Sequence, residues 1–355
     1  MPKLKGLRRQ GFLRVLIYEF FSAGGMDDNG DLSVLGFSML NAVLSDFMEI
    51  PGLEISTILH PRVKDLMVQV PYAEGVHIAW SEEGTGTWLE QYEARLEECD
   101  TVLVIAPETD GLSARLIGAA EGKGKQVLGS SAKAVALVGD KAETIKLLAS
   151  QGLPVPSTAT LTHPLPPHWQ TRIIEGFPMP MVLKPVSGAG GQGVMVIKDS
   201  ARLDLAVKQF KGVSGPAPFL VQEYISGEAV SVSCFVTAGQ VLTLSLNRQH
   251  IAEDEELYFQ GITIPYQHPQ AQEALDIAKG ACQAVDGLSG FVGVDLVLGQ
   301  TGPVIMEINS RVSVAYVALR EVVKRNLAQD LWLTCMEQRL PAPLEISGTY
   351  TYRVG

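Results

Sequence analysis

A predicted β-hairpin near the end of the chain, GVDLVLGQTGPVIMEINSR (residues 293–311), carries its most informative pattern. Two apolar runs flank GQTGP, where glycine and proline favour a turn. If a loop of about five residues is centred on Thr301, Asp295 lies directly opposite Glu307. Two carboxylates about 5 Å apart repel by about 3 kcal/mol at an effective dielectric of about 20. A divalent cation between them would remove this repulsion.

The residues beside this acidic pair predict a site for a hard cation. Strand alternation places Asn309 and Arg311 on the face of Glu307, while the intervening side chains point into apolar packing. Asp295, Glu307 and Asn309 form an all-oxygen set, which suits Mg²⁺ or Mn²⁺ and is poor for Zn²⁺. Arg311 is placed to stabilise negative charge beside the metal. The alternative, a strand pair with solvated charges, is disfavoured by the apolar neighbours.

A glycine-rich segment, SGAGGQG at residues 187–193, is the second candidate binding element. Gly188, Gly190 and Gly193 match the spacing of a dinucleotide-binding fingerprint, but that fingerprint requires a following helix. The next residues, VMVIKD, are typical of a strand, so the segment predicts a loop whose backbone N–H groups can wrap an anion. Lys184 on the entering strand is placed to neutralise phosphates. An ordinary glycine hairpin with a surface lysine stays an alternative.

The first part of the chain has the pattern of an α/β domain. Short apolar runs such as FLRVLIYE (12–19) and TVLVIAP (101–107) alternate with stretches of helical spacing, as over residues 32–48. Strands that alternate with helices predict a mostly parallel sheet covered on both faces.

The second part of the chain, from residue 131, has an α+β pattern. Two helical turns lead to GLPVP (152–156), and glycine-separated β runs follow. The proline-rich segment 162–172 is expected to be an exposed loop. One helix is predicted over 270–286 and a last helix over 318–338.

Composition and charge exclude several classes of protein. Lys and Arg number 28 and Asp and Glu 39, and the resulting charge of −11 argues against a nucleic-acid binder or an anionic-membrane binder. Hydrophobic residues make up 46% of the chain, enough for a sizeable core, yet no apolar run approaches the ~20 residues of a membrane span. Four dispersed cysteines without a CxxC pair indicate reduced thiols. We therefore expect a cytoplasmic protein.

Two further segments become candidate binding elements when they are considered together with the hairpin and the glycine-rich segment. VQEYISGE (221–228) reads as a strand that ends in a turn, an edge where backbone groups could pair with adenine. Lys141, at the start of a predicted helix, is another candidate cation, although a lone lysine there is usually solvated.

In chain order, Lys141, GLPVP, LKPVSGAGGQGV, QEYISGE, GVDLVL and EINSR resemble the ATP-grasp superfamily of carboxylate–amine ligases over about 170 residues. The resemblance implies an ATP-grasp fold behind a Rossmann-like pre-ATP-grasp domain. The implied domains are an N-terminal α/β domain over 1–130, a small lobe with a glycine-rich lid loop over 131–222 and a large lobe with the metal hairpin over 223–355. The two lobes would clamp ATP between them.

The resemblance also implies a role for each matching position. The phosphates, the adenine and Mg²⁺ (or Mn²⁺) would each have their own residues, and Arg311 would face the transferred phosphoryl group. The implied nucleotide contacts are Lys141, Lys184, Gly188, Gly190, Gly191, Gly193, Gln222, Glu223, Tyr224, Ile225 and Glu228. The implied metal ligands are Asp295, Glu307 and Asn309, and the implied catalytic residues are Lys184, Arg311 and Arg248. One departure is that the usual position of a ribose-binding glutamate holds Ala229, with Glu228 one residue early.

Three stretches, LIYEFFSAGGM (16–26), LSLNRQHI (244–251) and YFQGITIP (258–265), are similar to the tyramine–glutamate ligases of methanofuran biosynthesis. The similarity implies that L-glutamate is joined to the amine of tyramine or tyrosine through an acyl phosphate, with release of ADP and phosphate. Arg248 could hold a substrate carboxylate. The loop 19–25 leaves the carboxyl end of the first strand, the usual ligand position in such a sheet, although a plain strand-to-helix connection is the alternative.

Other functions stay open at this point. The same ATP site would serve another amino-acid or peptide ligase, or a non-catalytic ATP-binding subunit, although the retained acidic set argues against the latter. A nicotinamide oxidoreductase fails on the missing helix after the glycines. The expected partners are small-molecule acid and amine substrates, with no nucleic acid and no membrane. The oligomeric state is open, and a homodimer is one alternative.

Overall fold

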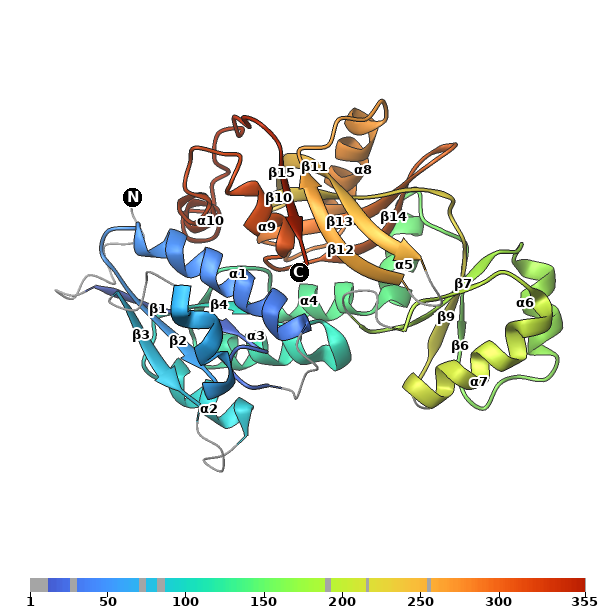
Figure 1. Cartoon of the computed structure of the whole chain (residues 1–355), viewed down its shortest axis with the longest axis horizontal. Coiled ribbons are helices and arrows are strands. Elements are labelled where there is room, and N and C mark those ends of the chain that lie inside the picture. Colours follow the sequence, from blue (N-terminus) through green and yellow to red (C-terminus); the bar gives the residue numbers. More distant parts are fainter. Residues whose placement is uncertain are drawn as a thin grey trace.

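The N-terminal part of the chain is built on a parallel sheet, as its strand and helix pattern predicts (Figure 1). The computed structural model describes residues 12–25, 31–69, 75–81, 87–188, 193–214, 217–253 and 257–354. The five-stranded N-terminal sheet has the order β3-β2-β1-β4-β5, and its neighbouring strands are parallel. Its elements are β1 (Leu13–Glu19), α1 (Asp31–Met48), β2 (Leu53–Leu59), β3 (Val76–Trp80), α2 (Trp88–Leu96), β4 (Thr101–Ile105), α3 (Leu112–Gly122) and β5 (Gln126–Val127).

Both faces of the N-terminal sheet are buried because side chains alternate along β1. Val15 and Ile17 join the core cluster that contains α1, while Leu16 and Tyr18 join the cluster that contains α2 and α3. A strand that is buried on both faces has a continuous apolar run in its sequence. This explains why the pattern alone predicts the strand over residues 12–19.

A second, four-stranded sheet, here called the small sheet, has the order β6-β9-β7-β8 and projects away from the rest of the molecule on the right of Figure 1. Two helices, α4 (Ala132–Gly139) and α5 (Lys141–Ser150), lead into it. Its elements are β6 (Thr158–Leu161), α6 (Trp169–Gly176), β7 (Met181–Pro185), β8 (Met195–Ile197), α7 (Leu203–Ser214) and β9 (Phe219–Glu223).

The prediction of an exposed loop over 162–172 is wrong at its C-terminal end. Helix α6 begins at Trp169. The Trp169 side chain is buried together with Ile173 in the core of the small sheet. The prolines precede the helix, where they are tolerated because they interrupt no interior hydrogen bond. The proline-rich composition therefore masked the start of an amphipathic helix.

The third and largest sheet, here called the large sheet, has six strands in the order β14-β13-β10-β11-β12-β15. One face packs on α8, through residues such as Val230, Val232 and Ala278. The other face, with Phe235 and Phe291, shares a core cluster with α1, α9 and α10. The elements are β10 (Gly227–Thr237), β11 (Gln240–Glu253), β12 (Leu257–Ile264), α8 (Ala271–Gln283), β13 (Gly290–Gly299), β14 (Gly302–Asn309), α9 (Val314–Leu319), α10 (Leu327–Met336) and β15 (Tyr350–Arg353).

The predicted last helix over 318–338 is wrong, because the structure has two helices there, α9 and α10. Between them Val323 pairs with Ile346 in an isolated β-bridge. Asn326 then caps α10, since its side-chain oxygen accepts the backbone N–H of Gln329 at 3.0 Å. The apolar residues around the break continue the helical spacing, so periodicity alone does not reveal it.

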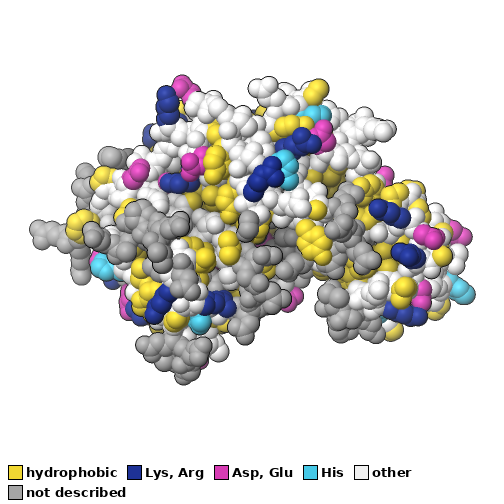
Figure 2. All heavy atoms as spheres, in the orientation of Figure 1, with side chains coloured by type: hydrophobic (Ala, Val, Ile, Leu, Met, Phe, Trp, Pro, Cys, Tyr) yellow, Lys and Arg dark blue, Asp and Glu magenta, His cyan; other side chains and the backbone are white. Residues whose placement is uncertain are grey.

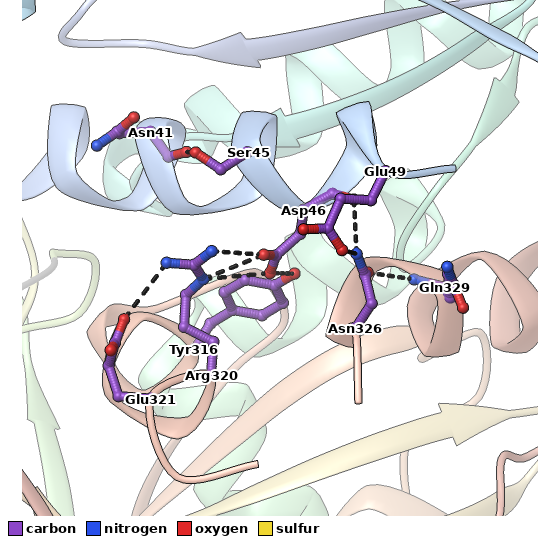
Figure 3. A network of polar contacts seen from close by, with 9 residues as sticks. All are labelled: Asn41, Ser45, Asp46, Glu49, Tyr316, Arg320, Glu321, Asn326 and Gln329. Carbon is purple, nitrogen blue, oxygen red and sulfur yellow. Dashed lines mark hydrogen bonds and ion pairs between the residues drawn. The ribbon is translucent and has the colours of Figure 1, made fainter. Parts of the chain in front are cut away.

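A polar network fastens α1 to the segment around α9 and α10 (Figure 3). Asp46 of α1 accepts hydrogen bonds from the Tyr316 hydroxyl at 2.8 Å and from the Arg320 guanidinium at 2.7 Å. Asn326 donates to the Asp46 carbonyl and to the Glu49 carboxylate, both at 2.8 Å. With the shared apolar cluster, these contacts join the N-terminal sheet and the large sheet into one packed unit.

The surface seen in Figure 2 carries charged side chains of both signs. The molecule also narrows in this view between the small sheet and the rest of the chain. In the ranges that the structure describes, no helix is both long enough and apolar enough to cross a membrane.

Candidate active site

The hairpin of β13 and β14 pairs Asp295 with Glu307, which confirms the predicted alignment. The connection between the two strands differs from the prediction. Gly299 pairs with Gly302, which leaves a two-residue turn in place of the longer loop. One extra residue in β14, Met306, forms a β-bulge that shifts the register by one position. The shorter turn and the bulge compensate each other, so the two acids still face one another.

Asp295 is held by two amide side chains. Asn309 donates to one of its carboxylate oxygens at 3.0 Å, and Gln249 of β11 donates to the other at 3.1 Å. Burial, together with the facing Glu307 carboxylate, raises the pKa of Asp295 well above its ordinary value. A cation bound between the two carboxylates would favour the charged form of Asp295.

Two lysines balance the other acid of the pair. The Lys141 ammonium lies 3.1 Å from the Glu307 carboxylate. Burial favours the neutral form of Glu307, but the charges of Lys141 and Lys184 outweigh that effect and lower the pKa of Glu307 below its ordinary value. Lys184, on the strand that leads into the glycine-rich segment 187–193, and the hairpin 293–311 thus lie close together.

Lys184 of β7 is almost completely buried, with 6% of its surface exposed. Burial lowers the pKa of Lys184 to about 8, with a smaller opposing effect of Glu307 and a further lowering by Lys141. A buried ammonium with one nearby carboxylate and one like charge is poorly compensated. Negative charge from a phosphate would compensate it.

Lys141 owes its position to the break between α4 and α5. Asp140 caps α5 by accepting the N–H groups of Ala142 and Glu143, which leaves Lys141 as the first helical residue. Its backbone N–H donates to the Val186 carbonyl at 3.0 Å, and its ammonium donates to the Gly188 carbonyl at 2.8 Å. The lysine is therefore tied to the strand end that leads into the glycine-rich segment.

The glycine-rich segment joins two antiparallel strands, because Leu183 of β7 pairs with Met195 of β8. A strand follows the glycines, which excludes the helix that a dinucleotide-binding fingerprint needs. Gly193 has a φ of 70°, a left-handed conformation that suits glycine. Gly190 and Gly191 lie outside the described residues.

The predicted adenine contacts lie at the end of β9 and on the link that follows it, since β9 ends at Glu223 and β10 begins at Gly227. The Gln222 side chain is buried and donates to the Thr158 hydroxyl at 2.8 Å. The Glu223 carboxylate accepts the Ser157 N–H at 3.4 Å. These side chains are engaged within the small sheet, and Tyr224 and Ile225 follow on the link itself.

Glu228 and Arg248 do not join the acidic pair. Ser231 pairs with Asp295 and shares its face, whereas Glu228, three residues earlier in the same strand, points to the opposite face. There Glu228 accepts a hydrogen bond from the Tyr266 hydroxyl at 2.6 Å and lies 3.5 Å from Arg248. The pairing of β10 with β13 is continuous, so no register shift brings Glu228 to the position of Ala229.

Arg311, two residues after Asn309, contacts a partner that sequence reasoning missed. Its guanidinium Nε donates to a Glu108 carboxylate oxygen at 3.2 Å. Glu108 follows β4 of the N-terminal sheet and belongs to no recognisable motif. Its place just past a parallel strand was the available signal. Gln249 was missed as well, although strand alternation from Asn247 places it on the inner face.

Comparison with known protein families agrees with this geometry. A pre-ATP-grasp domain family matches residues 53–135, and an ATP-grasp domain family matches residues 138–314. The chain is therefore an ATP-grasp protein with a pre-ATP-grasp domain before its ATP-grasp domain, and the predicted fold class is confirmed.

Two relatives that match most of the chain are tyramine–L-glutamate ligases. The tyramine–L-glutamate ligase of Methanocaldococcus fervens is 27% identical over 86% of this chain and 89% of its own length. The tyramine–L-glutamate ligase of Methanocaldococcus jannaschii is 26% identical over 86% of this chain and 84% of its own. Among solved structures, biotin carboxylase from Campylobacter jejuni covers 96% of this chain and 75% of its own, with a TM-score of 0.73 and 16% identity, which supports the fold alone.

Proposed function

We propose that this protein is an ATP-dependent carboxylate–amine ligase that forms an amide and releases ADP and phosphate. The observation that carries this proposal is the meeting of Lys141 and the buried Lys184 with the paired acids Asp295 and Glu307 in one cluster. L-Glutamate is the proposed acid, and tyramine or tyrosine is the proposed amine, in the biosynthesis of a methanofuran-type cofactor. The full-length similarity to tyramine–L-glutamate ligases supports this choice of substrates.

The acidic pair fits Mg²⁺ or Mn²⁺. Asp295, Glu307 and Asn309 offer oxygen atoms of the kind that these ions prefer. Burial and the Glu307 carboxylate raise the pKa of Asp295, so its charged form is unfavourable without further positive charge. When bound, the ion would supply that charge and would also offset the charge of the triphosphate.

The proposed reaction has two steps, and the protein contributes position and charge to both. The carboxylate of the acid attacks the γ-phosphate of ATP, ADP leaves, and the amine then displaces phosphate from the acyl phosphate. Lys141, Lys184 and Arg311 hold the phosphate oxygens in line for the transfer. The buried position of Lys184 helps to exclude water, which would otherwise hydrolyse the acyl phosphate.

The nucleotide is proposed to lie between the small and large sheets. The end of β9, with Gln222 and Glu223, and the following Tyr224 and Ile225 would hold the adenine. The glycine-rich segment 187–193 would bind the phosphates through backbone N–H groups. Glu228 and Arg248 are left out of this proposal, because their side chains lie on the other face of the large sheet.

An ADP-release screen tests the proposal. The full chain is incubated with ATP and Mg²⁺, with amino acids tested against amines that include tyramine and tyrosine. We expect ADP only when L-glutamate and the amine are both present, and mass spectrometry should find the amide. ADP release that needs no amine, or ATP binding without any turnover, would contradict the ligase function.

A further inference from the structure

Gln249 is a polar side chain of the large sheet to which the proposed reaction gives no part. It belongs to β11, and its side-chain amide donates to the Asp295 carboxylate of β13 at 3.1 Å. The order of the large sheet places β10 between these two strands, so the hydrogen bond crosses a whole strand. The contact therefore depends on which side chains β10 presents between the two residues.

Strand β10 presents small side chains along this path. Its pairing with β13 places Ser231 opposite Asp295. Its pairing with β11 places Ala229 opposite Gln249. Ala229 and Ser231 are two residues apart and share the face of Asp295, so the amide passes over them. A larger side chain at position 229 would occupy the space that the Gln249 side chain crosses.

The two acids of the hairpin are held in different ways. Glu307 lies 3.1 Å from the Lys141 ammonium, a partner that carries a full positive charge. Asp295 accepts one hydrogen bond on each carboxylate oxygen, from Asn309 at 3.0 Å and from Gln249 at 3.1 Å. These two donors are neutral amides, which fix the carboxylate without cancelling its negative charge. Each carboxylate oxygen can accept a further bond, so both stay able to bind a cation.

Neutral donors of this kind act on a metal site through the ligand that they hold. They fix the orientation of the ligand before the ion binds, and the loss of one donor typically weakens metal binding about 10- to 100-fold.

We infer that Gln249 is a positioning residue that holds Asp295 in the orientation needed to bind Mg²⁺ or Mn²⁺, and that the small side chain of Ala229 permits this contact. The inference rests on the proposed function. Gln249 acts through Asp295 and does not itself bind the ion or the substrates. Its removal should therefore change the affinity for the metal and leave the chemical step largely intact.

A neighbouring group of hydrogen bonds provides a comparison with a structural role. Asn247, two residues before Gln249 on the same face of β11, donates to Ser231 and Ser233 at 3.1 and 3.0 Å and accepts the Ser245 hydroxyl at 2.6 Å. All four residues of this group are buried. Their hydrogen bonds join β10 to β11, so Ser245 offers a matched position whose loss affects the sheet itself.

Binding of Mn²⁺ to the full chain saturated with ADP tests the inference, with the relaxation of water protons as the measure of protein-bound Mn²⁺. For Gln249→Met we expect the Kd for Mn²⁺ to rise about tenfold or more, because Asp295 loses one of its two donors. Gln249→Asn should act in the same direction, since its amide is one carbon shorter. ADP formation by both variants should fall at limiting Mg²⁺ and return to within about threefold of the wild-type rate at high Mg²⁺.

A further variant changes the path of the side chain and keeps the amide. Ala229→Leu retains every proposed metal ligand and places a branched side chain between Gln249 and Asp295. It should also raise the Kd for Mn²⁺ about tenfold. The double variant with Gln249→Met should bind Mn²⁺ about as well as either single variant, because both changes remove the same contact. Additive losses in the double variant would contradict the path assigned to Gln249.

Ser245→Ala is the control, and it should lower the urea midpoint while the Kd for Mn²⁺ stays at the wild-type value. The inference is wrong if Gln249→Met binds Mn²⁺ as tightly as the wild type, or if its ADP formation falls by the same factor at every Mg²⁺ concentration. Such results would leave the ligase function standing. A wild-type chain that binds no Mn²⁺ in the presence of ADP would overturn the proposed function itself, and this inference with it.

Discussion

Lys184 is a buried cation that destabilises the folded protein, which indicates a role in binding an anionic ligand. Burial lowers the pKa of Lys184 to about 8, below the ordinary value for a lysine. The folded state therefore disfavours the ammonium, and this unfavourable contribution is present below pH 8 and declines as the pH rises toward the unfolded value of about 10.4. A residue that destabilises the protein in the absence of ligand is explained by a ligand that needs its charge.

We predict that Lys184→Met separates stability from activity. ADP formation should fall about 100-fold or more, because one phosphate contact that is stronger in the transition state is removed. The free energy of unfolding in urea at pH 7 should stay within about 1 kcal/mol of the wild type or rise, since an apolar side chain replaces a buried charge.

Lys198→Met is the matched control, because Lys198 is exposed just after β8 of the same sheet. It should change neither ADP formation nor the free energy of unfolding. A Lys184→Met variant that turns over at the wild-type rate would remove Lys184 from the proposed mechanism.

The residue that caps α10 also connects this helix to α1. Asn326 accepts the N–H of Gln329 as a helix cap and also donates to Asp46 and Glu49 of α1. We predict that Asn326→Ala lowers the free energy of unfolding by about 1–2 kcal/mol. Asn326→Ser keeps a capping oxygen and loses the contacts to α1, so its loss should be smaller by about 1 kcal/mol. Urea unfolding measures both, and equal losses would show that the cap contributes nothing.

Elements were predictable where local pattern and packing agree. The strands of the N-terminal sheet follow from apolar runs, because both faces of a parallel sheet are buried. Asp295 and Glu307 could be aligned from their spacing alone, although Met306 and the tight turn reach that alignment in another way. The break between α9 and α10 depends on the bridge of Val323 with Ile346, a tertiary contact that periodicity does not contain.

The motifs of the candidate site could be predicted from the sequence. The contacts that its residues make between domains could not. Lys184 and the acids stand in recognisable patterns, whereas Glu108 gains its meaning only when β14 brings Arg311 to it, across a sequence separation of 203 residues. Arg248 was placed by resemblance alone, and the alternation of β11 turns it away from Asp295. Contacts of this kind depend on how separate sheets pack, which a single sequence does not reveal.

At the scale of the whole molecule, Asp46 holds the N-terminal sheet and the large sheet together. Its side chain is 7% exposed and lies 2.7 Å from the Arg320 guanidinium. We predict that Asp46→Ala lowers the free energy of unfolding by about 2–4 kcal/mol, because it leaves Arg320 and Tyr316 without their shared acceptor. Asp204→Ala, which removes an exposed pair with Lys208 on α7, should cost less than about 0.5 kcal/mol. Equal urea midpoints for the two variants would contradict a joining role for Asp46.

The fastening of α1 to the α9–α10 segment has a consequence for the order of events in a turnover (Figure 3). Glu19, Glu108 and the acidic hairpin all belong to the joined unit, whereas Lys184 and the glycine-rich segment belong to the small sheet. If turnover requires the small sheet to move, the acidic hairpin and the N-terminal sheet would therefore stay fixed to each other.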